Sequence, residues 1–211
     1  MLRLFRLCNI KGKDIEIMKI TKLVVASHNI GKINEIKTLL APLKIEVQSA
    51  ADLRLADVEE TGTTFEENAK LKANAVSLMC GLPCLADDSG LCVDALNGRP
   101  GVYSARYAPN RDFKQGMKML LDEIKDTGSD NRKAHFSCCL ALACPNQKTQ
   151  IFEGRVDGTI AEKPKGNNGF GYDAIFIPEG YEKTFGELGD DVKNNISHRR
   201  LALEKFIKEL K

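Results

Sequence analysis

The spacing of hydrophobic and polar residues predicts the elements of the chain before any chemistry is considered. A short run rich in β-branched residues, Lys22–Ala26, is typical of a strand. Apolar residues then recur at helical spacing, which predicts a helix after a polar loop at 27–32: Ile33, Ile36, Leu39 and Leu40. The folded part of the chain is therefore expected to begin with a strand, a loop and a helix.

A second helix is predicted from Phe65, because the residues around it form a capping signature. Thr64 and Glu67 are spaced so that the hydroxyl can accept from the backbone N–H of Glu67 while the carboxylate reaches back to Thr64. The inward stripe of this helix follows as Phe65, Ala69, Ala73, Val76 and Cys80. Amphipathic patterns predict further helices at 113–124 and 201–210, the latter with Ser197 as its N-cap.

A long strand is predicted at 134–144, where the side chains alternate between two sides. Pro145–Lys148 then turns the chain, and Thr149–Ile160 is expected to pair back as an antiparallel hairpin. Because strands and helices mix and this hairpin is antiparallel, we expect an α/β (mixed α+β) fold with a central mixed β-sheet flanked by helices. The set expected on one side of the long strand is Ala134, Phe136, Cys138, Leu140 and Leu142.

Composition places the chain among ordinary globular proteins. Its 211 residues are enough for one sizeable domain, and 43% of them are hydrophobic and 28% charged. The net charge of +2 provides no broad basic field, so we expect no nucleic-acid partner. No apolar run approaches the ~20 residues that span a membrane, and we expect no membrane partner. Seven irregularly spaced cysteines suit reduced thiols in the cytoplasm better than a disulfide framework.

The first seventeen residues differ from the rest of the chain. They mix basic residues with Leu and Phe, but they lack the long apolar stretch and the small-residue cleavage site of a targeting peptide. A second methionine, Met18, stands just before the first predicted strand. We therefore expect residues 1–17 to be a dispensable extension and 18–211 to form a single domain.

The stretch 85–91 brings two acids, a hydroxyl and a glycine to the end of an apolar run. Adjacent carboxylates in a partly dry site are usually satisfied by a cation or by donors, and Mg²⁺ prefers such hard oxygen ligands. Asp87 and Asp88 are therefore candidate metal ligands, and so is Glu60, ahead of the second helix. A polar turn at 87–90 and an acid that complements the helix dipole at Glu60 are the plain alternatives. If the strand continues, Asp87 and Asp88 point to opposite faces.

The loop at 27–32 joins a strand to a helix N-terminus, where free backbone N–H groups and the helix dipole attract phosphate. Lys32 would add a positive charge there. The loop is not a P-loop, because the first glycine and the four-residue spacing are missing. An ordinary turn capped by Asn29 explains the same residues equally well.

Two later stretches add binding chemistry. In 166–173, three glycines surround Phe170, whose ring offers a face to a nucleobase, although a glycine-rich hairpin with a half-buried phenylalanine has the same pattern. In 193–200, His198, Arg199 and Arg200 begin a helix, where cations oppose the dipole, and this indicates a nearby anion or carbonyl acceptor. With the acids and the loop at 27–32, these stretches predict a nucleotide site.

Six segments together resemble the inosine triphosphate pyrophosphatase family, whose members hydrolyse non-standard purine nucleoside triphosphates. They occur in that family's order, they cover the chain from about Lys19 to its C-terminus, and the segment 86–91 is typical of the bacterial branch. The segments are 27–32, 60–69, 85–91, 101–107, 169–173 and 196–199.

The resemblance implies hydrolysis of ITP, dITP or XTP to the monophosphate and pyrophosphate, with Mg²⁺ as cofactor. It also implies a homodimer, with an elongated sheet and an active-site cleft between two lobes. Asp88 would be the catalytic base and, with Glu60, a metal ligand. Asp87 would support the site without binding the metal itself. The residues implied to bind substrate are Ser27, His28, Asn29, Ile30, Gly31, Lys32, Ser89, Phe170, Gly171, Tyr172, Asp173, Lys193, His198 and Arg199.

Two positions depart from the family's pattern, namely Ala174 where proline is usual and Arg200 where glycine is usual. The second places a bulky cation beside the residues implied to read the base. Two other functions stay open at this point. One is a general nucleotide phosphatase, which would release orthophosphate. The other is a non-catalytic nucleotide-binding module, for which the near-neutral charge is poor support.

Overall fold

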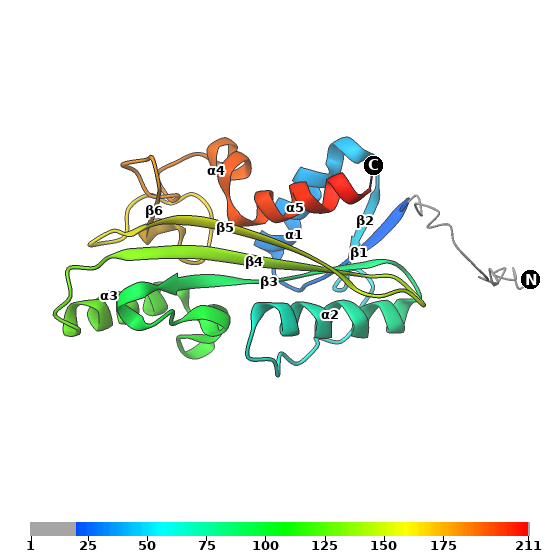
Figure 1. Ribbon diagram of the computed structural model, residues 1–211, viewed down its shortest axis with the longest axis horizontal. Helices are drawn as coiled ribbons and strands as arrows, with labels where there is room; N and C mark the ends of the chain where they lie inside the picture. Colours follow the sequence, from blue (N-terminus) through cyan, green and yellow to red (C-terminus); the bar gives the residue numbers. More distant parts are fainter. Residues whose placement is uncertain (1–19, 211) are drawn as a thin grey trace, which may run out of the picture.

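A computed structural model describes residues 20–210, so the predicted extension at 1–17 lies outside the described residues. Within this part of the chain, one mixed sheet has the strand order β2-β1-β3-β4-β5-β6 (Figure 1). β1 is parallel to both of its neighbours, and the pairs from β3 to β6 are antiparallel. The strands are β1 (Lys22–Ala26), β2 (Glu46–Ser49), β3 (Cys84–Val93), β4 (Lys133–Ala143), β5 (Gln150–Ile160) and β6 (Phe176–Pro178).

Helices flank the sheet, as the sequence predicts. α1 and α5 pack on one face and α2 packs on the other (Figure 1). Short 3-10 turns fill the connections around 94–111 and 173–175. The helices are α1 (Ile30–Leu40), α2 (Phe65–Cys80), α3 (Phe113–Asp126), α4 (Asp190–Ile196) and α5 (His198–Glu209).

Side-chain caps begin four of these helices, and the cap of α3 is Asp112. The predicted capping box of α2 is confirmed, since Thr64 accepts from the N–H of Glu67 and the Glu67 carboxylate accepts from the N–H of Thr64. Asn29 caps α1 by accepting from the N–H of Lys32, and Ser197 caps α5. Each cap satisfies backbone donors that a helix N-terminus leaves free.

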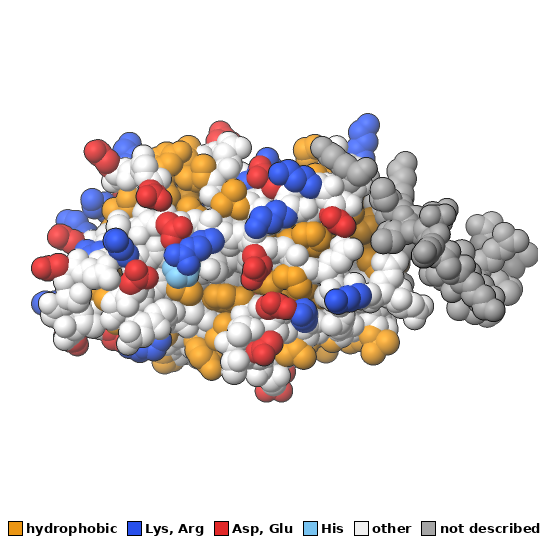
Figure 2. All heavy atoms as spheres, viewed as in Figure 1, with side chains coloured by type: hydrophobic (Ala, Val, Ile, Leu, Met, Phe, Trp, Pro, Cys, Tyr) orange, Lys and Arg blue, Asp and Glu red, His pale blue; other side chains and the backbone are white. Residues whose placement is uncertain are grey.

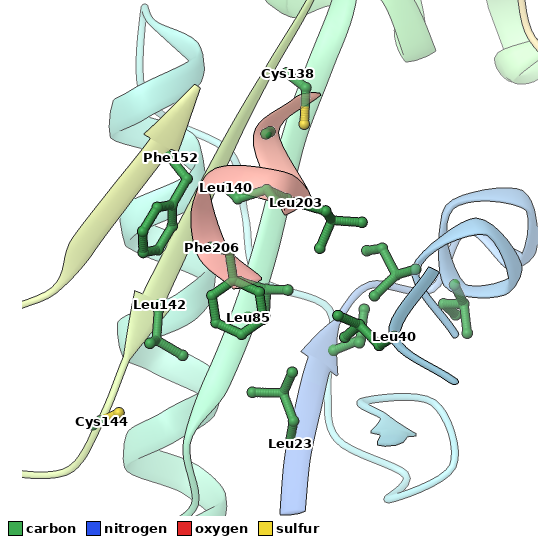
Figure 3. Close-up of a cluster of buried hydrophobic side chains, with 14 residues drawn as sticks. Leu23, Leu40, Leu85, Cys138, Leu140, Leu142, Cys144, Phe152, Leu203 and Phe206 are labelled. Carbon is green, nitrogen blue, oxygen red and sulfur yellow. The ribbon is translucent and has the colours of Figure 1, made fainter. Parts of the chain in front are cut away.

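The predicted alternation of β4 is confirmed, and it divides the core. Cys138, Leu140 and Leu142 face α1 and α5, where they join Leu203 and Phe206 (Figure 3). Further along the same face, Ala134 and Phe136 join a second core with α3 and the turns before and after β6. On the opposite face of β4, Cys139, Ala141 and Ala143 pack against α2. The expected division into two lobes corresponds to these two cores, at opposite ends of the long strands.

The surface carries charges of both signs. Lysine and arginine side chains are interspersed with aspartate and glutamate over the visible face, without one extended patch of either sign (Figure 2). This distribution agrees with the near-neutral balance of the sequence. Among residues 20–210, no helix combines the length and the apolar character needed to cross a membrane.

Candidate active site

Strand β3 continues past both acids of the stretch 85–91, and this settles how they point. Asp87 pairs in register with Leu140, and Asp88 pairs with Cys139, so the two carboxylates lie on opposite faces of the sheet. Both are buried, with 1% and 4% of their surface exposed. The alternative of a polar surface turn at these residues is therefore wrong, because the strand pairing extends to Val93.

The Asp88 side of the strand forms an acid and lysine cluster with helix α2. Lys72 donates to Asp88 Oδ1 at 3.1 Å, to Glu60 Oε1 at 2.5 Å and to the carbonyl of Asp87 at 2.8 Å. Asn68, one helical turn before Lys72, donates to Asp88 Oδ2 at 3.2 Å. Arg106 bonds Glu60 Oε2 at 3.0 Å. The two predicted metal ligands, Glu60 and Asp88, thus both pair with the ammonium of Lys72.

Burial and charge act in opposite directions on these acids. Burial raises the pKa of Asp88 above its ordinary value, and Lys72 opposes this only in part. Burial also favours the neutral form of Glu60, but the positive charges of Lys72, Lys32 and Arg106 together lower the pKa of Glu60. Of the two carboxylates, Asp88 is thus the one whose environment raises its pKa, the direction that favours a proton acceptor.

On the other face of β3, Asp87 is enclosed by donors from four elements, α1, α5, β4 and β3 itself. Lys32 lies 2.6 Å from Oδ1, and Arg199 Nε lies 2.8 Å from Oδ2. Ser89 donates to Oδ1 at 2.8 Å, and the thiol of Cys138 donates to Oδ2 at 3.1 Å. Burial alone would raise the pKa of Asp87, but Arg199 and Lys32 hold it well below its ordinary value.

A second layer of charge surrounds Arg199. Its Nη1 donates to Glu35 of α1, and Lys193 of α4 lies 2.7 Å from the other oxygen of Glu35. Lys193 also lies 2.6 Å from Asp173 Oδ2. Arg199 and Lys193 are nearly fully buried. The acceptor that the cations at the start of α5 indicated is therefore supplied by the protein's own carboxylates, Asp87 and Glu35.

The glycine-rich loop places Phe170 against the N-terminus of α1. A Cβ added at Gly31 would lie 2.7 Å from the ring of Phe170, so the loop reaches this position because residue 31 is glycine. Lys193 Nζ lies 4.4 Å from the centre of the ring. Asp173 accepts from the backbone N–H of Phe170 at 2.7 Å and closes the turn. Phe170 is only partly buried, unlike the charged groups around it.

Other residues of the predicted set have structural contacts. Ser27 accepts from the N–H of Asn29, and His28 contacts the carbonyl of Leu55, while Ile30 is exposed. Tyr172 lies in the second core and donates to the carbonyl of Ser104 at 3.0 Å.

His198 stacks on Phe136 with ring centres 4.8 Å apart. Complete burial, reinforced by the neighbouring Arg199 charge, holds the pKa of His198 well below its ordinary value, so the ring is neutral at physiological pH. Its substrate role, like those of the other residues implied by the resemblance, stays a prediction.

Three residues of this site were not singled out from the sequence. Asn68 and Lys72 are one turn apart and flank the inward stripe of α2, so a lysine among inward positions was the available signal. Glu35 has a similar position on α1, next to the buried Ile36. Helical spacing alone does not show which groups such side chains meet.

The fold and the site together define an α/β protein with a densely charged site where the parallel strand β1 ends, the edge at which α/β proteins bind ligands. Comparison with known proteins identifies the family within this class. Residues 23–209 match the Ham1 family, and the chain belongs to that family.

Individual relatives align along most of the chain. A dITP/XTP pyrophosphatase of Bacillus subtilis is 48% identical over 189 residues, which are 89% of this chain and 96% of that protein. One from Agrobacterium fabrum is 46% identical over 88% of this chain and 94% of its own length. The solved structure of a HAM1 protein from Coxiella burnetii superposes with a TM-score of 0.83 at 41% identity, covering 90% of this chain and 98% of that one.

Proposed function

We propose that this protein hydrolyses non-standard purine nucleoside triphosphates (ITP, dITP and XTP) to the nucleoside monophosphate and pyrophosphate. The observation that supports this most is the convergence of Glu60 and Asp88 beside a cluster of buried cations, in a chain 46–48% identical to dITP/XTP pyrophosphatases. The open alternatives, an orthophosphate-releasing phosphatase and a non-catalytic module, have no specific observation in their favour.

The residues divide the reaction between the two faces of β3. Asp88 orients a water molecule and accepts its proton as the oxygen attacks the α-phosphorus, and the bond to the α,β-bridging oxygen breaks. Lys32, Lys193 and Arg199 carry the positive charge that binds the triphosphate and the base. Because these cations are paired with the protein's own acids, substrate anions must compete with Asp87, Glu35 and Asp173 for them.

Glu60 and Asp88 also fit the Mg²⁺ that the family resemblance implies. They are hard oxygen donors, and they are close enough to share one ammonium. Two carboxylates suffice for an ion that keeps several waters and binds substrate phosphates as well. Bound Mg²⁺ would neutralise charge that develops on the phosphates.

Specificity for the base follows from donors that meet a 6-oxo group. His198 and Arg199 are implied to bind that edge of the purine, and adenine would present an amine to them and leave donors unpaired. This argument excludes adenine more firmly than guanine, whose 6-oxo group is the same. The homodimer that the resemblance implies is part of the proposal, and light scattering on the purified protein measures it.

The identity of the released product tests the proposed function. With ITP and Mg²⁺, we expect phosphate to be detected by malachite green only after inorganic pyrophosphatase is added. Phosphate without that enzyme would indicate the general phosphatase. Binding of ITP in calorimetry without turnover would indicate the non-catalytic module.

Replacing Phe170 by leucine is expected to raise KM for ITP by about 5- to 150-fold, because stacking on a base contributes about 1 to 3 kcal/mol. Leucine still fills the space next to Gly31, so the loop is expected to keep its place. Steady-state kinetics measure the change, and Phe170→Tyr, which keeps an aromatic face, is the control. An unchanged KM for ITP in Phe170→Leu would refute the stacking role of Phe170.

Arg200→Gly is expected to leave base preference unchanged, within about twofold in the ratio of kcat/KM for ITP over GTP. Arg200 Nη2 lies 3.0 Å from Glu204, one turn further along α5, so its charge is bound on the helix itself. The departure from the family's glycine therefore does not place a free cation at the base. A ratio that moves well beyond twofold in Arg200→Gly would contradict this.

A further inference from the structure

The ammonium of Lys72 uses its whole hydrogen-bonding capacity inside the site. An ammonium has three donors, and Lys72 directs them to Glu60 Oε1, Asp88 Oδ1 and the carbonyl of Asp87 at 2.5, 3.1 and 2.8 Å. Its side chain is 9% exposed, in the middle of α2. A lysine buried in this way is a fixed internal cation, not a surface group.

The carboxylates that it bridges have no oxygen left without a protein donor. Glu60 Oε2 accepts from Arg106 at 3.0 Å, and Asp88 Oδ2 accepts from Asn68 at 3.2 Å. A divalent cation coordinated by Glu60 and Asp88 would lie beside the ammonium of Lys72, which both acids already bind. A like charge left beside the bound cation would oppose binding unless a new anion accepted the ammonium.

We propose that Lys72 is a positioning residue that acts as an exchangeable counter-ion. In the free protein it bridges Glu60 and Asp88 and keeps divalent cations off them. When cation and triphosphate arrive together, the phosphate oxygens accept the ammonium of Lys72, and the two carboxylates are released to the cation. This inference rests on the proposed function, and it makes metal binding depend on the presence of substrate phosphate.

Titration of the full chain with MgCl₂ in the absence of nucleotide tests this role, with calorimetry as the readout. We expect Lys72→Met to bind Mg²⁺ about 10- to 100-fold more tightly than the unaltered protein, because methionine keeps the apolar stem and removes the competing charge. Lys70→Met is the matched control. Lys70 lies on the same helix but is 42% exposed and pairs with Glu66, so its removal is expected to leave the affinity unchanged.

Equal Mg²⁺ affinity in Lys72→Met and the unaltered protein would overturn the proposal, and so would an equal gain in Lys70→Met. If Lys72→Met does not give a cooperative thermal unfolding transition, Lys72→Gln, which keeps a donor without the charge, is titrated in its place under the same criteria. The proposed function is tested separately, by measuring pyrophosphate release from ITP. If the unaltered protein releases pyrophosphate but Lys72→Met binds Mg²⁺ no more tightly, only the counter-ion role is refuted. If the unaltered protein releases no pyrophosphate, the proposed function itself is refuted.

Discussion

Replacing Asp88 by asparagine is expected to lower kcat for pyrophosphate release from ITP by about 10²- to 10⁴-fold, the usual contribution of a positioned base. Asparagine has the same shape and its side-chain oxygen can still accept from Lys72, which lies 3.1 Å away, but it cannot take a proton from water. The loss should therefore appear in the chemical step, with the fold retained. Kinetics with a coupled pyrophosphate assay measure it, and thermal unfolding monitors the fold.

A matched control comes from the other end of β3. Asp94 follows the strand and is exposed, so Asp94→Asn makes the same chemical change outside the site. We expect this control to keep full activity. An Asp88→Asn protein as active as Asp94→Asn would refute both the assignment of the base and the mechanism that depends on it.

Asp87→Asn should act mainly on stability, lowering the free energy of unfolding by about 3 to 5 kcal/mol, since it removes one partner from a buried ion-pair network. Lys32 would lose its carboxylate, and Arg199, only 1% exposed, would retain Glu35 as its one paired acid. Urea denaturation measures the difference. Asp157→Asn is the control, because Asp157 pairs with Arg155 in an exposed bridge whose loss should cost about 1 kcal/mol or less.

This stabilisation should also depend on pH in a definite direction. The pKa of Asp87 in the folded protein lies well below its ordinary 3.8, so the unfolded chain takes up a proton at higher pH than the folded protein does. The stabilisation is therefore present above about pH 3.8 and is lost as the pH falls toward the lowered pKa. The gap between the unaltered protein and Asp87→Asn should narrow below pH 3.8. A gap that widens on acidification would contradict the buried ion pair.

Features encoded within one element were predictable from the sequence. The start of α2 followed from Thr64 and Glu67, because both partners of the cap lie within one turn. The two sides of β4 followed from its alternation, since a strand exposes successive side chains to opposite faces. The same rule gave the opposite orientations of Asp87 and Asp88 once the strand was known to continue.

The charge pairing of the site was not predictable in this way, because it depends on packing between distant elements. Asp87 and Arg199 are 112 residues apart in the sequence, and no local spacing relates them. Lys72 reaches Glu60 and Asp88 only because α2 packs across β3. Sequence reasoning named most of these acids and cations separately and missed Glu35 and Lys72, and the structure shows that they pair with one another.

The position of Arg199 also affects the order in which contacts of the site can form while the chain is synthesised. The guanidinium that joins β3 to α1 belongs to α5, the last helix of the described chain. Until α5 has emerged from the ribosome, Asp87 and Glu35 lack the guanidinium that pairs with both of them. The earlier strands can pair as they emerge, but a chain interrupted before residue 198 would lack this connection, whatever else had folded.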